Sequence, residues 1–287
     1  MAFPFGAVLT LSLLFLVVFS FPNVHANGIS SSWKHAAHNV IGSNHVVDVP
    51  KHHGRELLTG PWKKARATFY EGGVGTFGGA CGYDDVVKDG YGLDTVALST
   101  VLYKKGKKCG ACYEIQCVDS PGCKKGKISI TVTATDLCPP NYALPRDNGG
   151  WCNPPGRHFD LAKPAYLKIA DYKAGVVPIT YRSVPCKRKG GIRFTITGNP
   201  YFNLVKVSNV GGAGDVVGVQ VRGEDKLKWT QLKRNWGQRW ETNAMLCEET
   251  LSFRVRTSDG RWSTSKSVAP KGWQFGQTFV GKNFGKK

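Results

Sequence analysis

The stretch ISITVTATD, at residues 128–136, is a short run of β-branched and small residues that ends on an aspartate. Isoleucine, valine and threonine are enriched in strands, so the run predicts a β-strand. Working outward, ARATFY (65–70), ACYEIQC (111–117) and VVPITYR (176–182) are similar runs, and glycines and prolines separate them. This part of the chain therefore predicts a small β-barrel.

Two segments between these runs predict short helices. They are LDTVALSTVLY (93–103) and FDLAKPAYLKIADY (159–172). Pro164 stands near the start of the second segment, where a helix tolerates proline. We expect these helices to connect strands of the barrel.

The composition changes at VPCKRKGG (184–191), which marks a domain boundary. Beyond it, two runs alternate apolar and polar residues with the period of a strand. Their apolar positions are Ile192, Phe194 and Ile196 in the first run, and Leu251, Phe253 and Val255 in the second. Short strands at this spacing, without a convincing helix, predict an antiparallel β-sandwich.

The first 26 residues predict a secretory signal. An uncharged apolar run from Phe5 to Phe21 precedes Val24-His25-Ala26, a small-x-small cleavage pattern. An uncleaved membrane anchor is the alternative, but the apolar run falls short of the roughly 20 residues that span a bilayer. Residues 27–64 hold five of the seven histidines at irregular spacing and predict a flexible extension without a metal site. We therefore place the barrel at 65–187 and the sandwich at 188–287.

Nine cysteines agree with secretion. Eight lie between Cys81 and Cys186, and Cys247 stands alone. In a cytosolic protein CGAC (109–112) could indicate zinc or a redox dithiol, but behind a signal a dense cluster predicts a disulfide framework. Eight cysteines allow 105 pairings, so the residues alone leave the connectivity open. Cys247 would be a free thiol or a link between chains.

The net charge of +19 is uneven along the chain. Residues 188–287 hold 18 Lys and Arg against 7 Asp and Glu, which favours a polyanionic environment. Secretion argues against nucleic acid and for an acidic polysaccharide matrix. A solvated cationic surface with no specific partner is the alternative.

Asp160, in WCNPPGRHFDLAKPAY (151–166), is the best candidate for a catalytic acid. Inverting cleavage of a glycosidic bond needs two carboxyl groups about 6.5–9.5 Å apart. Asp136 is a second candidate for the same groove. A helix N-cap at Asp160 and a turn at Asp136 are the structural alternatives.

A second carboxylate is not assured on the strand ATFYEGG (67–73). Thr68 and Tyr70 share one face of this strand, and Gly72 continues that face. Glu71 points the other way unless a bulge turns it.

Aromatic residues mark the second half. Tyr201 and Phe202 follow Asn199-Pro200, and KWTQLKRNWGQRW (228–240) contains Trp229, Trp236 and Trp240. Exposed aromatic rings stack on sugar rings, whereas buried ones belong to the core. We expect some of each.

Taken together, the chain over roughly residues 65–284 resembles a plant α-expansin. The resemblance rests on ordered motifs: ATFYEGG, GGACGY, YGLDTVALSTVLY, CGACYEIQC, TATDLCPPNYALP, GGWCNPP, HFDLAKPAY, YRSVPCKRKGGIRF, GNPYFNLVKVSNVGGAGDV, KLKWTQLKRNWGQRW and GWQFGQTF. It implies a mainly β fold, with a six-stranded double-psi β-barrel similar to family-45 endoglucanases, followed by an immunoglobulin-like, cellulose-binding β-sandwich. It also implies wall loosening at acidic pH without hydrolysis, by disturbing contacts between cellulose and matrix glycans.

The resemblance also assigns residues. Thr68, Tyr70 and Asp160 match the polar groove of the family, with Asp160 at the general acid of the related hydrolases and Gly72 where those enzymes carry their base. Tyr201 and Trp236, with Trp229, match a sugar-binding platform, and Trp240 is expected to be buried. The implied disulfides are Cys81–Cys109, Cys112–Cys186, Cys117–Cys123 and Cys138–Cys152.

The expected partners are cellulose and matrix polysaccharides such as xyloglucan and acidic pectin, bound by a monomer that needs no cofactor or metal and does not bind nucleic acid. The chain departs from the family at Glu71, where glycine is common, at Asp136, where asparagine is common, at Cys247 and in the His-rich extension. An inverting endoglucanase, and a secreted binding or defence protein, are the alternatives.

Overall fold

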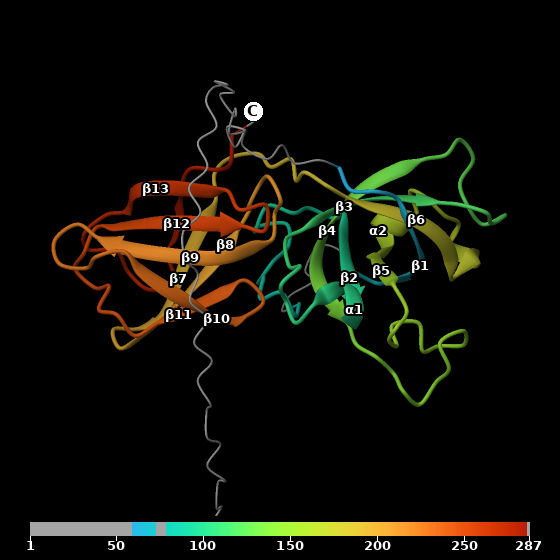
Figure 1. Ribbon diagram of the computed structural model, residues 1–287, viewed down its shortest axis with the longest axis horizontal. Coiled ribbons are helices and arrows are strands. Elements are labelled where there is room, and N and C mark those ends of the chain that lie inside the picture. The colour runs from blue at the N-terminus through green and yellow to red at the C-terminus, as the bar shows by residue number, and fades with distance from the viewer. Residues whose placement is uncertain (1–58, 73–78, 286–287) are drawn as a thin grey trace, which may run out of the picture. The chain divides into compact units, whose positions relative to one another are not determined.

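The computed structural model describes residues 59–72 and 79–285 (Figure 1). The expected signal and nearly all of the expected His-rich extension lie outside the described residues. Gly60 already donates a backbone hydrogen bond to the Ser183 carbonyl, and the first strand begins at Lys63, just before the expected start of the barrel. No helix in the described part of the chain is long and apolar enough to cross a membrane.

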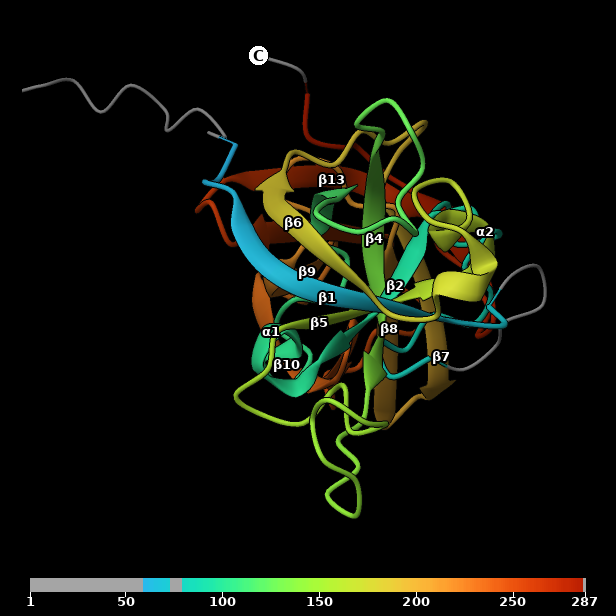
Figure 2. The ribbon, with the colours of Figure 1, turned by 90° about the vertical axis from the view of Figure 1, so that its right-hand side faces the viewer.

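The first half forms a closed six-stranded barrel with the strand order β1-β5-β2-β4-β3-β6. Its elements are β1 (Lys63–Tyr70), β2 (Thr95–Ser99), α1 (Thr100–Tyr103), β3 (Cys112–Cys117), β4 (Ser129–Cys138), β5 (His158–Ala162), α2 (Lys163–Tyr166), the short η1 (Tyr172–Ala174) and β6 (Val177–Val184). The β1–β5 and β2–β4 pairs are parallel and the others antiparallel. Figure 2 shows β1 lying between β6 and β5.

A group of aromatic rings packs inside the barrel. The ring centroid of Phe159 lies 4.6 Å from that of Tyr181 and 5.4 Å from that of Tyr113, and all three residues are buried. Because Phe159 and Leu161 point into this core, the strand period directs Asp160 to the outside of the barrel. The fold therefore presents Asp160 on a wall rather than within the core.

The two helix predictions were largely wrong. Residues 95–99 and 158–162 form strands β2 and β5, and only Thr100–Tyr103 and Lys163–Tyr166 are α-helical. All five residues of β2 are buried, and its apolar residues Val96, Ala97 and Leu98 follow one another without the alternation of a half-exposed strand. Short runs of this kind cannot be told from buried helix by their period. Pro164 does stand in the first turn of α2.

Four disulfides cross-link the barrel: Cys81–Cys109, Cys112–Cys186, Cys117–Cys123 and Cys138–Cys152. These are the pairs that the resemblance implies. Cys109 and Cys112 of CGAC have different partners, so this motif is neither a zinc site nor a redox dithiol. Cys247 is free and partly exposed.

The second half is an antiparallel β-sandwich with the strand order β13-β12-β9-β10-β11-β8-β7-β14. Its strands are β7 (Arg193–Asn199), β8 (Phe202–Ser208), β9 (Val216–Gly223), β10 (Thr230–Trp236), β11 (Arg239–Thr242), β12 (Leu251–Thr257), β13 (Trp262–Ala269) and β14 (Thr278–Val280). The start of β10 pairs with β9 and its end pairs with β11, so β10 passes from one layer to the other. Figure 1 shows β13, β12 and β9 side by side in one layer.

The predicted alternation in the sandwich is confirmed. Its six apolar positions, Ile192, Phe194, Ile196, Leu251, Phe253 and Val255, are fully buried. The Phe194 and Phe253 rings stack between the two layers with centroids 4.5 Å apart. Local periodicity was sufficient to predict which residues are buried, because each of these strands buries only one face.

Candidate functional site

The candidate groove residues lie in one row across four neighbouring barrel strands. Thr68 of β1 pairs with Asp160 of β5, Asp160 pairs with Ala97 of β2, and Ala97 pairs with Asp136 of β4. Directly opposed residues point to the same face of a sheet. Asp136 and Asp160 therefore share a face and are separated by one strand, which sets their Cα atoms about 10 Å apart.

Asp160 is a partly buried acid with a single side-chain donor. The Thr68 Oγ1 hydroxyl donates a hydrogen bond of 2.7 Å to Asp160 Oδ1. Burial raises the pKa of Asp160, the bond from Thr68 lowers it, and the negative charge of Asp136 raises it, so that the pKa lies above its ordinary value. Asp160 therefore takes up a proton at a higher pH than an exposed aspartate.

His158 completes a chain of hydrogen bonds behind Asp160. Its Nε2 lies 2.8 Å from Thr68 Oγ1, and its backbone N–H donates to Ser99 Oγ at 3.0 Å. Since the one hydroxyl hydrogen of Thr68 is directed to Asp160, His158 Nε2 must carry the hydrogen that it donates to Thr68. The buried Nδ1 of His158 has no hydrogen-bond partner.

The His158 imidazole is neutral. Burial lowers its pKa from 6.5 to about 4, and the positive charge of Arg66 contributes in the same direction. His158 is a site residue that none of the sequence motifs singled out. Strand parity was the available signal, because residues 158 and 160 of a strand share one face.

Tyr70 stands near both carboxylates as a neutral phenol. Burial raises its pKa, hydrogen bonding to Thr95 lowers it, and the charges of Asp136 and Asp160 raise it. A Cβ atom at Gly72 would lie 2.3 Å from Cε2 of the Tyr70 ring. The ring therefore occupies the space that any side chain at position 72 would need.

Backbone amides hold the Asp136 carboxylate. The N–H groups of Ala80 and Leu137 donate to its Oδ1 at 2.6 Å and 2.7 Å. These two bonds fix the orientation of the carboxylate, whose charge raises the pKa of both Asp160 and Tyr70.

Glu71 is turned away from this row, as the strand period predicts. Its Oε1 lies 2.9 Å from Nζ of Lys163 on α2, and its side chain is 76% exposed. The Glu71 carboxylate raises the pKa of Lys163. Glu71 is therefore a surface ion-pair residue and does not face Asp160 with Thr68.

A groove of about 620 Å³ opens beside Thr68 and Asp160. Phe69 and Trp151 line it, together with the Cys138–Cys152 disulfide, which ties down the loop that carries Trp151. An acid on an aromatic wall can hydrogen-bond the hydroxyls of a sugar whose ring lies against the aromatic side chains.

The candidate aromatics of the sandwich differ in exposure and position. Tyr201 is 78% exposed and Trp236 is 42% exposed, whereas Trp240 is buried in the core. Trp236 lies against Arg239 of β11, with the guanidinium carbon 5.4 Å from the ring centroid. Trp229 contacts Arg222 of β9 and Arg254 of β12, in the other layer, so the structure does not group it with Trp236.

A metal centre is not apparent in residues 59–72 and 79–285. No group of three or more His, Cys, Asp or Glu side chains converges there in a way that could hold an ion.

Comparison with known proteins identifies the class. Residues 192–270 match the family described as Expansin C-terminal domain, and residues 95–181 match the double-psi barrel family described as Lytic transglycolase. Expansin-A32 of Oryza sativa subsp. japonica is 61% identical over 240 residues, which cover 82% of this chain and 89% of that protein. Expansin-A23 of Arabidopsis thaliana is 52% identical over 78% of this chain and 81% of that protein.

The chain therefore belongs to the expansins, a family of cell-wall-loosening proteins. A solved structure, the apo expansin of Clavibacter michiganensis, covers 78% of this chain and 97% of its own with a TM-score of 0.59 and 19% identity. A mutant of that protein in complex with cellohexaose aligns with a TM-score of 0.57 and 19% identity. These two likenesses support the fold of a barrel followed by a sandwich.

Proposed function

We propose that this chain is a secreted protein that loosens plant cell walls at acidic pH without hydrolysing polysaccharide. It would act as a monomer and disrupt noncovalent contacts between cellulose and matrix glycans such as xyloglucan and acidic pectin. Asp160 would hydrogen-bond glucan hydroxyls in the groove, while Tyr201 and Trp236 hold the cellulose surface. The cellohexaose complex of the similarly folded bacterial expansin supports a cellulose-type ligand.

One observation carries the proposal. Asp160 lies in the groove with Thr68 as its donor, and its raised pKa means that it takes up a proton at a higher pH than an exposed aspartate does. A protonated Asp160 can donate a hydrogen bond to a sugar oxygen, which an ionised one cannot do. This switch would make groove binding strongest at acidic pH.

The arrangement around Tyr70 supports a non-hydrolytic role. A base at position 72 would stand beside the acid in the related hydrolases, but Gly72 has no side chain and the Tyr70 ring fills the space. Without a placed base, an acid can bind or exchange protons but does not activate water for inversion.

An inverting endoglucanase is the second candidate function. One observation favours it: Asp136 and Asp160 point to the same face, one strand apart. In that case Asp160 would protonate the leaving oxygen and Asp136 would activate water. The spacing of their strands is compatible with the separation that such a pair needs, so direct measurement must decide.

The test combines extension with sugar analysis. Purified protein is added to heat-killed wall strips under constant load at acidic pH, and the bath is assayed for released sugar. Extension without sugar release supports the proposal, and Asp160→Ala, which can neither donate nor accept the bond, should abolish extension while cellulose binding persists. Sugar release that Asp160→Asn and Asp136→Asn both abolish would establish the hydrolase instead.

A further inference from the structure

The outer face of the β13-β12-β9 layer has an unusual composition. Val219, Val221, Phe253 and Val255 of β9 and β12 point into the core, so the residues between them point outward. The register aligns these outward residues in rows across the layer. The rows are Trp262–Arg256–Gly218, then Thr264–Arg254–Gln220–Gln231, then Ser252–Arg222.

Three arginines of this face lack an acidic partner. In the described part of the chain, no carboxylate forms an ion pair with Arg222, Arg254 or Arg256, although twelve ion pairs are present elsewhere in it. The Nε atom of Arg222 is buried and has no hydrogen-bond partner. Neighbouring cations repel one another, so such a cluster without acids favours an anionic ligand.

Two tryptophans flank the arginines. The guanidinium carbons of Arg254 and Arg222 lie 4.5 Å and 5.4 Å from the Trp229 ring centroid, and that of Arg256 lies 5.9 Å from the Trp262 centroid. Trp262 is 44% exposed. Stacking on rings orients guanidinium groups while their N–H edges remain available to acceptors. We call Arg222, Arg254, Arg256, Trp229 and Trp262 the Arg–Trp face.

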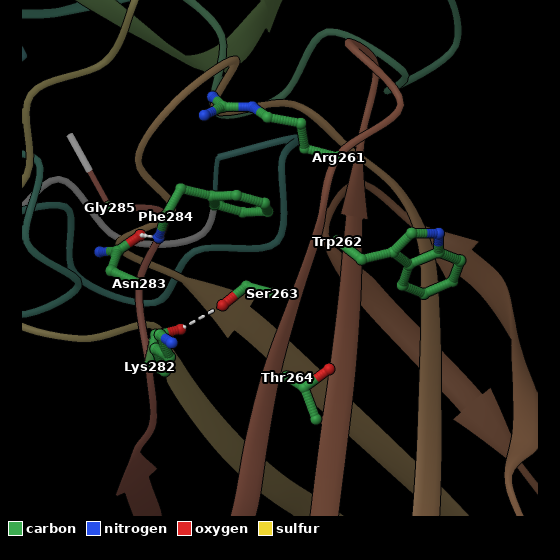
Figure 3. Close-up of a pocket in the computed structure, with 8 residues that line it drawn as sticks. All are labelled: Arg261, Trp262, Ser263, Thr264, Lys282, Asn283, Phe284 and Gly285. Carbon is green, nitrogen blue, oxygen red and sulfur yellow. Dashed lines mark hydrogen bonds between the residues drawn. The ribbon is translucent and has the colours of Figure 1, made fainter. Parts of the chain in front are cut away.

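A pocket of about 460 Å³ continues this face around the edge of β13 (Figure 3). The C-terminal segment forms its other side, and Ser263 Oγ donates to the Lys282 carbonyl at 2.8 Å to hold that segment beside β13. The pocket is lined by Trp262, Thr264, Arg261, Lys282 and Phe284, among others. The Asp259 carboxylate neutralises Arg261, whereas Lys282 has no carboxylate partner in the described residues.

We propose that the Arg–Trp face is a second polysaccharide site, specific for acidic chains that carry uronate carboxylates. Guanidinium forks bind carboxylates through two parallel hydrogen bonds, and an exposed indole stacks on the apolar face of a sugar ring. Cellulose is neutral and gives the arginines no countercharge. The proposal rests on the proposed function in taking an acidic cell-wall polysaccharide as the ligand, and it adds the site that binds it.

The site is distinct from the proposed cellulose platform. Trp236 contacts Arg239, which forms an ion pair with Asp84, and neither belongs to the β13-β12-β9 layer. A chain bound to the Arg–Trp face would therefore leave Tyr201 and Trp236 free. One protein could then hold cellulose and an acidic matrix chain at the same time.

The test is direct binding of the purified full chain to polygalacturonate, to the same polymer fully methyl-esterified, and to cellulose. Arg254→Gln/Arg256→Gln should weaken polygalacturonate binding about tenfold, equivalent to about 1.4 kcal/mol, because two guanidinium groups that can bind carboxylates are lost. Added salt should weaken wild-type binding more steeply than binding by the double variant. Cellulose binding should not change.

The control removes the same charge elsewhere. Lys105→Gln/Lys125→Gln takes two exposed lysines from the barrel and should leave polygalacturonate binding within about twofold of the wild type. Trp262→Ala removes an exposed ring without changing charge, and should weaken binding even if the arginine variant folds poorly. Near-ultraviolet circular dichroism checks that each variant is folded.

Three outcomes would overturn the inference. The first is an equal loss of polygalacturonate affinity in the arginine and lysine variants. The second is that the methyl-esterified polymer binds as tightly as polygalacturonate. The third is tighter binding to single-stranded DNA or to phosphatidylserine vesicles than to polygalacturonate. These results are independent of wall extension. If extension fails or sugar is released, the proposed function is wrong. The proposal for the Arg–Trp face is decided separately, by the polygalacturonate binding measurements.

Discussion

Because His158 behind the groove is buried and neutral, the free energy of unfolding should decrease as the pH falls, by an amount that follows from the pKa of this histidine in the folded chain. His158 has a pKa of about 4 in the folded chain, against an ordinary value near 6.5 in an unfolded one. As the pH falls below 6.5, His158 becomes protonated in the unfolded state but stays neutral in the folded state. Stability from this residue is therefore complete above pH 6.5 and is lost as the pH falls toward 4.

The magnitude follows from linkage. The pKa difference, at about 1.4 kcal/mol per pKa unit, gives a loss of about 2 kcal/mol by pH 5 and about 3 kcal/mol by pH 4. Asp160 acts in the opposite sense, because its raised pKa lets the folded state bind a proton first. Asp160 is present in the wild type and in both variants below, so its contribution cancels in the comparison.

Two substitutions separate the titration of His158 from its hydrogen bond. His158→Gln removes the titrating group but keeps an N–H that can reach Thr68, whereas the shorter side chain of His158→Asn loses that contact. Urea unfolding at pH 7, 5 and 4, followed by near-ultraviolet circular dichroism, measures the free energy of unfolding. Both variants should lose about 3 kcal/mol less than the wild type between pH 7 and pH 4.

At pH 7 the asparagine variant should be the less stable of the two, by about 1–3 kcal/mol, because the Thr68 hydroxyl loses a partner. A wild type and variants with parallel pH profiles would refute the reasoning. That result would mean that His158 takes up a proton as readily in the folded chain as in the unfolded one.

Gly72→Asp should not create hydrolysis, because the new Cβ would clash with the Tyr70 ring. We expect the free energy of unfolding to fall by about 1–3 kcal/mol and wall extension to decrease. Release of sugar from cellulose by this variant would contradict the prediction. Trp240→Ala should cost about 3–5 kcal/mol in the free energy of unfolding because the residue is in the core, and a loss below about 1 kcal/mol would place it outside. Trp236→Ala should weaken cellulose binding with little change in the unfolding midpoint, and unchanged binding in a pull-down assay would remove it from the platform. Glu71→Gln should change the free energy of unfolding by less than about 1 kcal/mol and leave wall extension unchanged, because the ion pair of Glu71 with Lys163 is at the surface. Loss of extension would instead assign Glu71 a role in the groove.

The sequence alone determined the features that depend on local period. The alternation at Ile192, Phe194 and Ile196 predicted which face of β7 is buried, and strand parity predicted that Glu71 faces away from Thr68 and Tyr70. Both follow from backbone geometry that repeats every two residues, whatever the rest of the chain does. The motifs added the family and, through it, the disulfide pairs.

The tertiary structure was needed to establish that residues 95–99 and 158–162 are strands: burial on both sides removes the alternation from the first, and the second is only five residues long and runs directly into the helix α2. It also placed Asp136 and Asp160 on either side of Ala97, set His158 behind Thr68, and put Trp229 among arginines rather than beside Trp236. These neighbours come from different strands, far apart in the chain. Their contacts depend on strand order and register, which barrel closure and sheet pairing impose and which no local pattern encodes.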